Sequence, residues 1–514
     1  MMVSDKKSCE KWIAQAPLGD PVTACGAVAQ LLESLEDHPP KKAQAHLEVL
    51  ECLRRPIVLT AEALAYRLGG RALPLTEAES QSFMSGCDMY SAYGRAFRRL
   101  IQLSHSEADS TLVEQLPLML GRAAECSCEL MIMHYRVRRE IDGEHWHDLH
   151  ELYRLAESLG VASTPPPPAS ERTPSCADAY VRALLLSLTT PYGMTPRAFD
   201  WARRWVRRWS GKVELTRESG PRDSIAVNLA SSFAPRARAA ANEGEELLRF
   251  LDLSTLRRSV KSRIRALEEG EDPHALGLGS EGSPEELLEI LRLLYQQWFE
   301  MPIARQYKRR LISSRAELLG GFAIAHAAMC DAAPVQKRHE WEFSRAEWER
   351  IAVTGSQPVY QPPPVSVTPE RWDLLEESAM GFRLRRRDTG LRFFHRQLIA
   401  LRPQGDNRFI LAEIRWLITG IDSTVTMGVR NLPGLAMAVT VRPASSPEGA
   451  RFREAFALPG SGNEPATLVL AGGMFKPDLV IEMKANDVVR KVVVKELVYR
   501  GFDFDRVEFA VVGN

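Results

Sequence analysis

The chain has 514 residues, of which 45% are hydrophobic and 26% are charged. This length and composition are typical of a globular protein with roughly three domains. Lys plus Arg and Asp plus Glu both total 66, so the formal net charge is zero, which argues against a protein that coats nucleic acid, because such proteins are basic on balance.

The cysteines and the N-terminus indicate the compartment. Eight cysteines are scattered along the chain without a CxxC pair, as expected for buried thiols in a reducing environment. The N-terminal lysines precede no apolar run, and no later segment approaches the ~18 apolar residues that a membrane helix needs. We expect a cytoplasmic protein without a membrane span.

In the first 300 residues, apolar residues recur with the period of an α-helix. Apolar residues recur at spacings of three and four in segments such as AVAQLLESL, which predicts one helical domain over 1–162 and a second over 177–300. The proline run within 163–176 predicts a linker, because consecutive prolines lack N–H donors. Ser283 followed by Pro284 predicts the start of the last helix, with Ser283 as its N-cap.

Beyond residue 370 the apolar residues recur at every second position. In the segment STVTMGVRNL, the residues Val425, Met427 and Val429 alternate with small or polar residues, and several similar runs follow between turn residues. Short strands at this spacing predict a small barrel or sandwich. The predicted fold class is therefore α+β and multidomain: a helical N-terminal region of about 300 residues, then a C-terminal β-barrel or β-rich domain.

Two motifs have ordinary structural interpretations. GLGSEG at 277–282 fits G-x-G-x-x-G, but no strand precedes it as a dinucleotide fold requires, so we interpret it as a loop between helices. HWHDLH offers histidines two apart, which point away from each other on a helix and do not complete a metal site. No pattern of nucleophile and base was found, and we predict that the protein is not an enzyme and has neither a catalytic residue nor a metal site.

The segment FDWARRWVRRW places tryptophans four apart, flanked by arginines. Such a face could stack on nucleic acid or lie on an anionic membrane. The more ordinary interpretation is that Trp201, Trp205 and Trp209 are core residues and the arginines are solvated.

Two short segments favour a phosphate-bearing ligand. RQYKR fits RxxxR with Arg305 and Arg309, and Arg310 follows directly. A guanidinium group pairs with phosphate oxygens through two hydrogen bonds and stacks on a purine. The second segment, ESAMG, carries Ser378 and Gly381 in a turn before a strand, where a hydroxyl and a close backbone approach suit a phosphate or a guanine edge.

Together these motifs resemble the PilZ domain, a six-stranded β-barrel that binds the bacterial second messenger cyclic di-GMP. That family has RxxxR ahead of the barrel and then [D/N]xSxxG, which Glu376, Ser378 and Gly381 match in register. On this resemblance we predict a PilZ-like barrel over 301–442 with an insertion at 331–368, followed by a β-rich extension over 443–514.

The resemblance implies a cytoplasmic bacterial receptor in which cyclic di-GMP is the ligand and no further cofactor is required. Capture of the ligand would then be relayed through the helical region to an unidentified protein partner. The residues that the resemblance assigns to ligand binding are Arg305, Arg309, Arg310, Glu376, Ser378 and Gly381.

Two alternatives of other classes remain. Glu376 stands where the family has Asp or Asn, and the gap between the two motifs is long, which favours a ligand-free protein-interaction scaffold with a degenerate barrel. The other alternative is a nucleic-acid binder that uses the tryptophan–arginine helix, against which the zero net charge counts.

Overall fold

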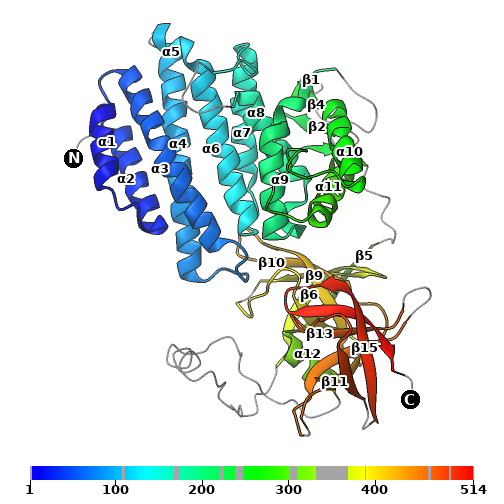
Figure 1. The fold of residues 1–514 in the computed structure, drawn as a ribbon. Helices are drawn as coiled ribbons and strands as arrows, with labels where there is room; N and C mark the ends of the chain where they lie inside the picture. The colour runs from blue at the N-terminus through cyan, green and yellow to red at the C-terminus, as the bar shows by residue number, and fades with distance from the viewer. Residues whose placement is uncertain are drawn as a thin grey trace. The chain divides into compact units, whose positions relative to one another are not determined.

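The structure is a computed structural model of the whole chain, and it divides into two compact units (Figure 1). The first unit holds most of residues 1–306, and the second holds most of residues 307–514. The predicted fold class is confirmed, with helices first and strands last. The residues that the structure describes are 3–512 except 107–109, 167–173, 219–224, 238–246, 301–308, 331–367, 388, 448, 461–464 and 486–487.

Long helices form most of the first unit, and Figure 1 shows them side by side. Several begin at a side chain that accepts a hydrogen bond from a free backbone N–H, for example Asp20 in α2, Asp142 in α7 and Ser175 in α8, which is the usual stabilisation of a helix N-terminus. The helices are α1 (Lys6–Gln15), α2 (Pro21–Asp37), α3 (Ala43–Leu68), α4 (Glu77–Ser106), α5 (Ser110–Glu114), α6 (Leu116–Arg136), α7 (Gly143–Ser158), α8 (Cys176–Leu188), α9 (Pro196–Trp209), α10 (Ser254–Glu268) and α11 (Pro284–Phe299).

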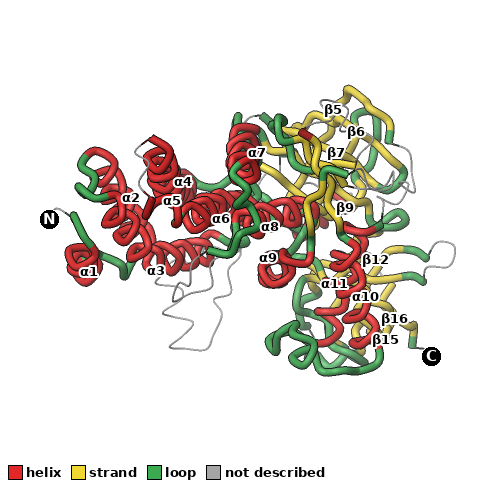
Figure 2. The backbone as a smooth tube through the Cα atoms, turned by 90° about the horizontal axis from the view of Figure 1, so that it is seen from above, coloured by secondary structure: helices red, strands yellow, loops and turns green. Residues whose placement is uncertain are grey.

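Helix α6 lies at the centre of this unit. It packs against α4, α7 and α8, and in Figure 2, which looks down on the helices, α4, α6 and α8 follow one another in a row. Even the charged Arg122 of α6 is 2% exposed, and it is satisfied by Glu51 and Glu125 at 2.8 and 2.9 Å. No described helix combines the length and the apolar character required to cross a bilayer.

A small antiparallel sheet lies in the region for which the sequence predicts helices only. Its strands run in the order β1-β4-β2-β3, and they are β1 (Glu214–Thr216), β2 (Ile225–Asn228), β3 (Arg236–Ala237) and β4 (Leu248–Asp252). The prediction of helices throughout 177–300 was wrong here, because strands of two to five residues are too short to establish a period of two.

The tryptophan–arginine helix is α9, and its aromatic face belongs to the core. Trp201, Trp205 and Trp209 are 5%, 0% and 3% exposed, and the Trp205 indole donates to the Leu278 carbonyl at 3.1 Å. The GLGSEG segment is therefore part of the loop that covers α9. Buried indoles cannot stack on nucleic acid, so the ordinary structural interpretation of this helix is confirmed.

The second unit consists of two closed six-stranded barrels. The first barrel has the strand order β10-β7-β6-β5-β8-β9, and the second has the order β11-β12-β13-β16-β15-β14. The strands of the first are β5 (Arg310–Gly320), β6 (Glu370–Ser378), β7 (Gly381–Arg386), β8 (Leu398–Pro403), β9 (Ile410–Thr419) and β10 (Val425–Asn431). Those of the second are β11 (Met437–Pro443), β12 (Arg453–Leu458), β13 (Thr467–Ala471), β14 (Val480–Ala485), β15 (Val488–Arg500) and β16 (Phe504–Val511).

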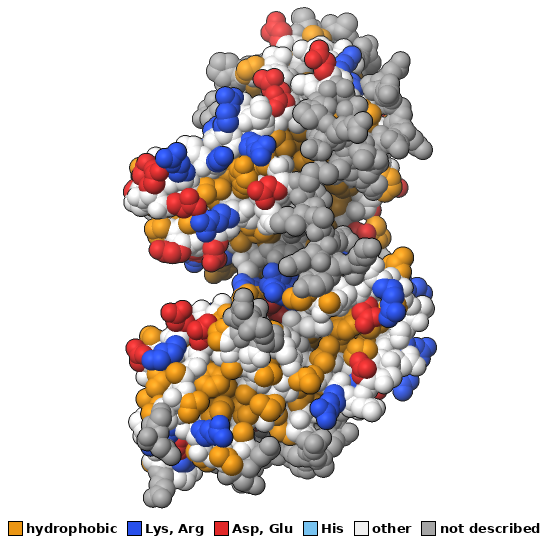
Figure 3. All heavy atoms as spheres, turned by 90° about the vertical axis from the view of Figure 1, so that its right-hand side faces the viewer, with side chains coloured by type: hydrophobic (Ala, Val, Ile, Leu, Met, Phe, Trp, Pro, Cys, Tyr) orange, Lys and Arg blue, Asp and Glu red, His pale blue; other side chains and the backbone are white. Residues whose placement is uncertain are grey.

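The β-rich extension predicted over 443–514 thus contributes five strands of a closed barrel, and β11 supplies the sixth. Nearly all of the predicted insertion at 331–368 lies outside the described residues. In the second barrel Val492, Val494 and Val507 are fully buried, whereas Val489 and Val511 are about half exposed. Figure 3 shows hydrophobic side chains gathered on the visible face of this unit.

The two barrels share an interface within the second unit. Helix α12 (Phe322–Met329), which follows β5, packs against strands of both barrels, and the His326 Nε2 atom lies 2.8 Å from the Val439 carbonyl oxygen. Across the same interface the rings of Phe394 and Phe502 stack at 4.0 Å. Apolar contacts of this kind hold the barrels together as one body.

A carboxylate also joins the barrels and predicts a pH effect. Asp503 accepts a hydrogen bond from the Leu398 N–H at 2.9 Å, and burial raises its pKa from 3.8 to about 6. A raised folded-state pKa stabilises the protein at low pH, and this contribution is lost as the pH rises from about 4 to 6.

We therefore expect Asp503→Asn to be more stable than the wild type by about 3 kcal/mol at pH 7.5 and to match it near pH 4. Thermal unfolding of both proteins across this range measures the difference. Asp478→Asn is the control for the charge change, since its side chain is 83% exposed. An advantage of Asp503→Asn that does not vary with pH would contradict the expectation.

Candidate functional site

The candidate site lies on the first barrel, where β6 and β7 form a hairpin. Ser378 ends β6, Gly381 begins β7, and the two residues pair across the turn. The Ser378 hydroxyl donates to the Gly381 carbonyl oxygen at 3.1 Å. The Ser–Gly turn that the sequence analysis singled out is thus the tip of this hairpin.

Gly381 is required by a close approach of two strands. A Cβ atom at this position would lie 1.9 Å from the Val429 carbonyl oxygen of β10, which is far inside van der Waals contact. Only glycine allows β7 and β10 to pair at this spacing.

We expect Gly381→Ala to destabilise the protein by about 3 kcal/mol, because the clash is with backbone and no side-chain rotation relieves it. Ser378→Ala is the matched variant in the same turn. It removes only one hydrogen bond and should cost about 1 kcal/mol. Thermal unfolding of the two variants measures both effects, and equal melting temperatures for Gly381→Ala and Ser378→Ala would contradict the steric argument.

Two arginines converge on one carboxylate beside this hairpin. The guanidinium groups of Arg309 and Arg383 lie 2.8 and 2.9 Å from the two carboxylate oxygens of Glu376. The Glu376 side chain is 15% exposed, whereas the arginines are 40% and 44% exposed. Partial burial acts to raise the pKa of Glu376, but the hydrogen bonds from Arg309 and Arg383 outweigh it and hold the pKa below its ordinary value.

A β-bulge places Glu376 in this position. Leu374 pairs with Leu384 and is buried, and Glu376 pairs with Arg383, so β6 has one extra residue between these pairs. Residues two apart on a regular strand share a face. Without the bulge Glu376 would follow Leu374 into the barrel, so the extra residue turns the carboxylate toward the arginines.

An indole extends the same group of residues. Gly428 of β10 pairs with Arg383, and a Cβ atom at Gly428 would lie 2.1 Å from the Trp416 Nε1 atom, so the indole lies against the glycine. The Arg383 guanidinium carbon is 6.0 Å from the centre of the Trp416 ring. We name Arg309, Glu376, Arg383, Gly428 and Trp416 the arginine–tryptophan row.

The other residues assigned by resemblance have different positions. Arg310 pairs with Glu377 at 2.9 Å, and its side chain is 77% exposed, so it lies outside the row. Arg305 lies outside the described residues. The structure thus brings Arg309 and Glu376 together and places Ser378 and Gly381 in the adjoining turn.

The sequence analysis did not assign Arg383, Gly428 or Trp416 to the site. A signal existed for the glycine, because a glycine inside a strand often marks a close approach of another group. The chemistry of the row suits an anion with a flat ring: guanidinium groups bind phosphate oxygens in pairs, and an indole stacks on a base.

The histidine cluster has structural contacts. The His150 imidazole, which is fully buried, lies 2.7 Å from the Tyr180 hydroxyl and 2.9 Å from the Phe233 carbonyl oxygen. Both ring nitrogens therefore have partners within the fold. Among the described residues no group of His, Cys, Asp and Glu is arranged to hold a metal ion.

These features define a multidomain α+β protein with a helical unit and a unit of two six-stranded barrels. Residues 7–221 match the family model described as "Cyclic-di-GMP receptor FimW, N-terminal domain". No curated protein matches the chain. The match falls on the helical unit, in which the sequence analysis found no resemblance, and not on the barrel that resembles the PilZ domain.

Proposed function

We propose that the protein is a cyclic di-GMP receptor and that the arginine–tryptophan row on the first barrel binds the ligand. The family match over residues 7–221 supports the receptor class. The observation that carries the assignment to the barrel is the convergence of Arg309 with Glu376, 67 residues apart in sequence, beside the Ser378–Gly381 turn.

In this proposal each guanidinium group of the row binds phosphate oxygens, and a guanine base stacks on Trp416. Arg309 and Arg383 are each nearly half exposed and within reach of solvent. The Glu376 carboxylate holds both groups in the ligand-free protein, so the ligand must displace it. The negative charge of Glu376 thus competes with the ligand phosphates for the two guanidinium groups.

The helical unit would carry the signal. It forms the larger of the two compact units and contains nearly all of the family match. We propose that it contacts an unidentified protein partner in the cytoplasm of a bacterium and that the protein acts by binding and not by catalysis. A fragment of residues 1–300 should capture that partner from a lysate if the interaction lies there.

A ligand-free scaffold is the second candidate, and one observation favours it. Glu376 already neutralises the arginines with good geometry, at 2.8 and 2.9 Å, as a permanent structural ion pair would. In that case the barrel is a structural module, and the row adds only to its stability.

Calorimetric titration of the full chain with cyclic di-GMP separates these candidates. The receptor proposal predicts saturable binding of cyclic di-GMP. The absence of binding heat at several temperatures would select the scaffold.

A further inference from the structure

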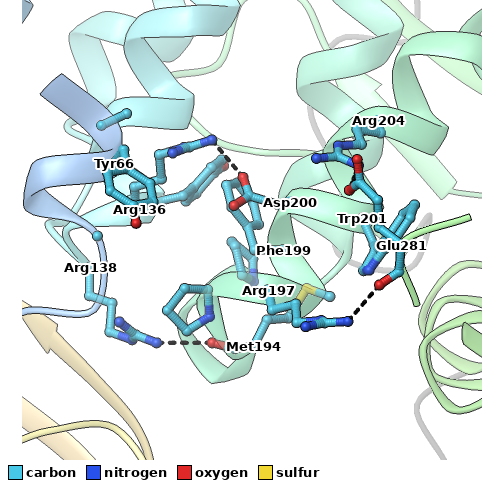
Figure 4. Close-up of a pocket in the computed structure, with 15 residues that line it drawn as sticks. Tyr66, Arg136, Arg138, Met194, Arg197, Phe199, Asp200, Trp201, Arg204 and Glu281 are labelled. Atoms are coloured by element: carbon cyan, nitrogen blue, oxygen red, sulfur yellow. Dashed lines mark hydrogen bonds and ion pairs between the residues drawn. The ribbon is translucent and has the colours of Figure 1, made fainter. Parts of the chain in front are cut away.

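The helical unit contains a pocket of about 350 Å³, well separated in sequence from the arginine–tryptophan row. This volume falls within the range of small-molecule sites. The C-terminal part of α3, the end of α6, the connection from α8 to α9 and the first turns of α9 form its wall (Figure 4). Apart from Glu281, its lining residues lie within the segment that matches the family model.

One cation in the wall has no acidic partner among the described residues. Arg138 is 5% exposed, and its guanidinium group donates one hydrogen bond, to the Met194 carbonyl oxygen at 2.9 Å. Its buried Nε atom has no hydrogen-bond partner in the described part of the chain, and burial lowers the pKa of Arg138 to about 10. A buried charge without a counter-charge is costly, so an anion in the pocket would stabilise it.

The other guanidinium groups of the wall are already neutralised. Arg136 lies 2.5 Å from the Asp200 carboxylate, Arg204 lies 2.6 Å from Glu281, and Arg197 pairs at 2.6 Å with Glu286, which is outside the lining. Each of these arginines has a carboxylate within 2.6 Å, whereas Arg138 has none among the described residues. One further negative charge in the pocket would therefore balance the charge of Arg138.

The rest of the wall is apolar and rich in rings. Tyr66 stands at the rim and is 88% exposed, and the Arg204 guanidinium carbon lies 4.9 Å from the Trp201 ring centre. Tyr135 and Phe199 form a further aromatic surface, with ring centres 6.0 Å apart. Figure 4 shows Tyr66 and Arg138 on one side of the pocket and Trp201 and Arg204 on the other, with Phe199 between them. Aromatic and guanidinium faces together favour a flat ring.

We propose that this pocket is a second ligand site, separate from the barrel, that binds a small molecule with a flat aromatic ring and a phosphate group, of the nucleoside monophosphate class. Arg138 supplies the counter-charge for the phosphate. Tyr66 contacts the ring from one side of the pocket, and Arg204 bounds the opposite side. The proposal goes beyond the receptor function of the barrel and does not depend on it.

The test is calorimetric titration of the full chain with 5′-GMP, and with inorganic phosphate in a second arm. Because Arg138 also holds the Met194 segment, the variants are made at the rim: Tyr66→Ala and Arg204→Ala, both at solvent-accessible side chains. We expect each to weaken 5′-GMP binding at least tenfold.

Two controls separate this site from the row on the barrel. Arg208→Ala removes an arginine of the same helix that bonds the Gly277 carbonyl oxygen outside the pocket, and it should leave the affinity unchanged. Arg309→Ala should also leave it unchanged. The proposal would be overturned if 5′-GMP affinity were lost only in Arg309→Ala or were unchanged in both rim variants. It would also be overturned if 5′-GMP bound no more tightly than inorganic phosphate.

Discussion

Replacement of Arg309 and Arg383 together by alanine is expected to weaken cyclic di-GMP binding at least about 100-fold. Each guanidinium group would form charge-assisted hydrogen bonds to the ligand, worth about 1.5–3 kcal/mol apiece, and a loss of 2.8 kcal/mol is a factor of about 100 in the dissociation constant. Calorimetry with the full chain measures this change.

The control for this double variant is Arg402→Ala, which removes a barrel arginine that pairs with Glu317 away from the row. It should bind cyclic di-GMP as the wild type does. Because the double variant leaves Glu376 without its two partners, its melting temperature must also be measured. A folded double variant with wild-type affinity would remove the row from the site.

Replacement of Glu376 by asparagine is expected to strengthen cyclic di-GMP binding about tenfold. In the ligand-free protein the carboxylate occupies donors of both arginines, and a phosphate must displace it. Asparagine, which the PilZ family accepts at this position, has no charge to compete, and a gain of about 1.4 kcal/mol corresponds to a factor of ten.

The comparison for this variant is Glu377→Gln, which removes the neighbouring carboxylate that pairs with Arg310 outside the row. Its affinity should equal that of the wild type. If Glu376→Asn binds more weakly than the wild type, the carboxylate contributes to the ligand site and does not compete with it. Binding that appears only in Glu376→Asn would identify the natural protein as the scaffold with a closed site.

The helices could be predicted from the sequence because their signals are local. Ser283 accepts a hydrogen bond from the Glu286 N–H at the start of α11, as the N-cap pattern predicts. The sheet of β1 to β4 could not be predicted, because its longest strand has five residues and its pairing joins segments that are distant in sequence. Barrel closure is likewise a property of pairing between distant strands.

The candidate site could be predicted in part. RxxxR and the Ser–Gly turn led to Arg309, Ser378 and Gly381, which lie near one another in the structure. The position of Arg383 depends on the bulge between Leu374 and Glu376, and a bulge shifts the face of a side chain without a marker in the sequence. For that reason a regular period of two assigns Glu376 to the wrong face.

The pocket of the helical unit could not be predicted from the sequence. Its pocket gathers Tyr66, Arg138 and Arg204 from three separate helices or loops, and each residue alone resembles an ordinary surface or core residue. The tryptophans of α9 were the conspicuous feature, yet their burial makes them part of the fold. Only the packing of α3, α6 and α9 reveals that Arg138 has no carboxylate partner among the residues that the structure describes.

A crystal structure of the full chain with cyclic di-GMP is the most direct test of the central claim that the first barrel binds the ligand at the arginine–tryptophan row. The account predicts phosphate oxygens about 3 Å from the guanidinium groups of Arg309 and Arg383, a guanine ring against Trp416, and Glu376 displaced from both arginines. Ligand density elsewhere, with Glu376 still between the two arginines, would contradict it.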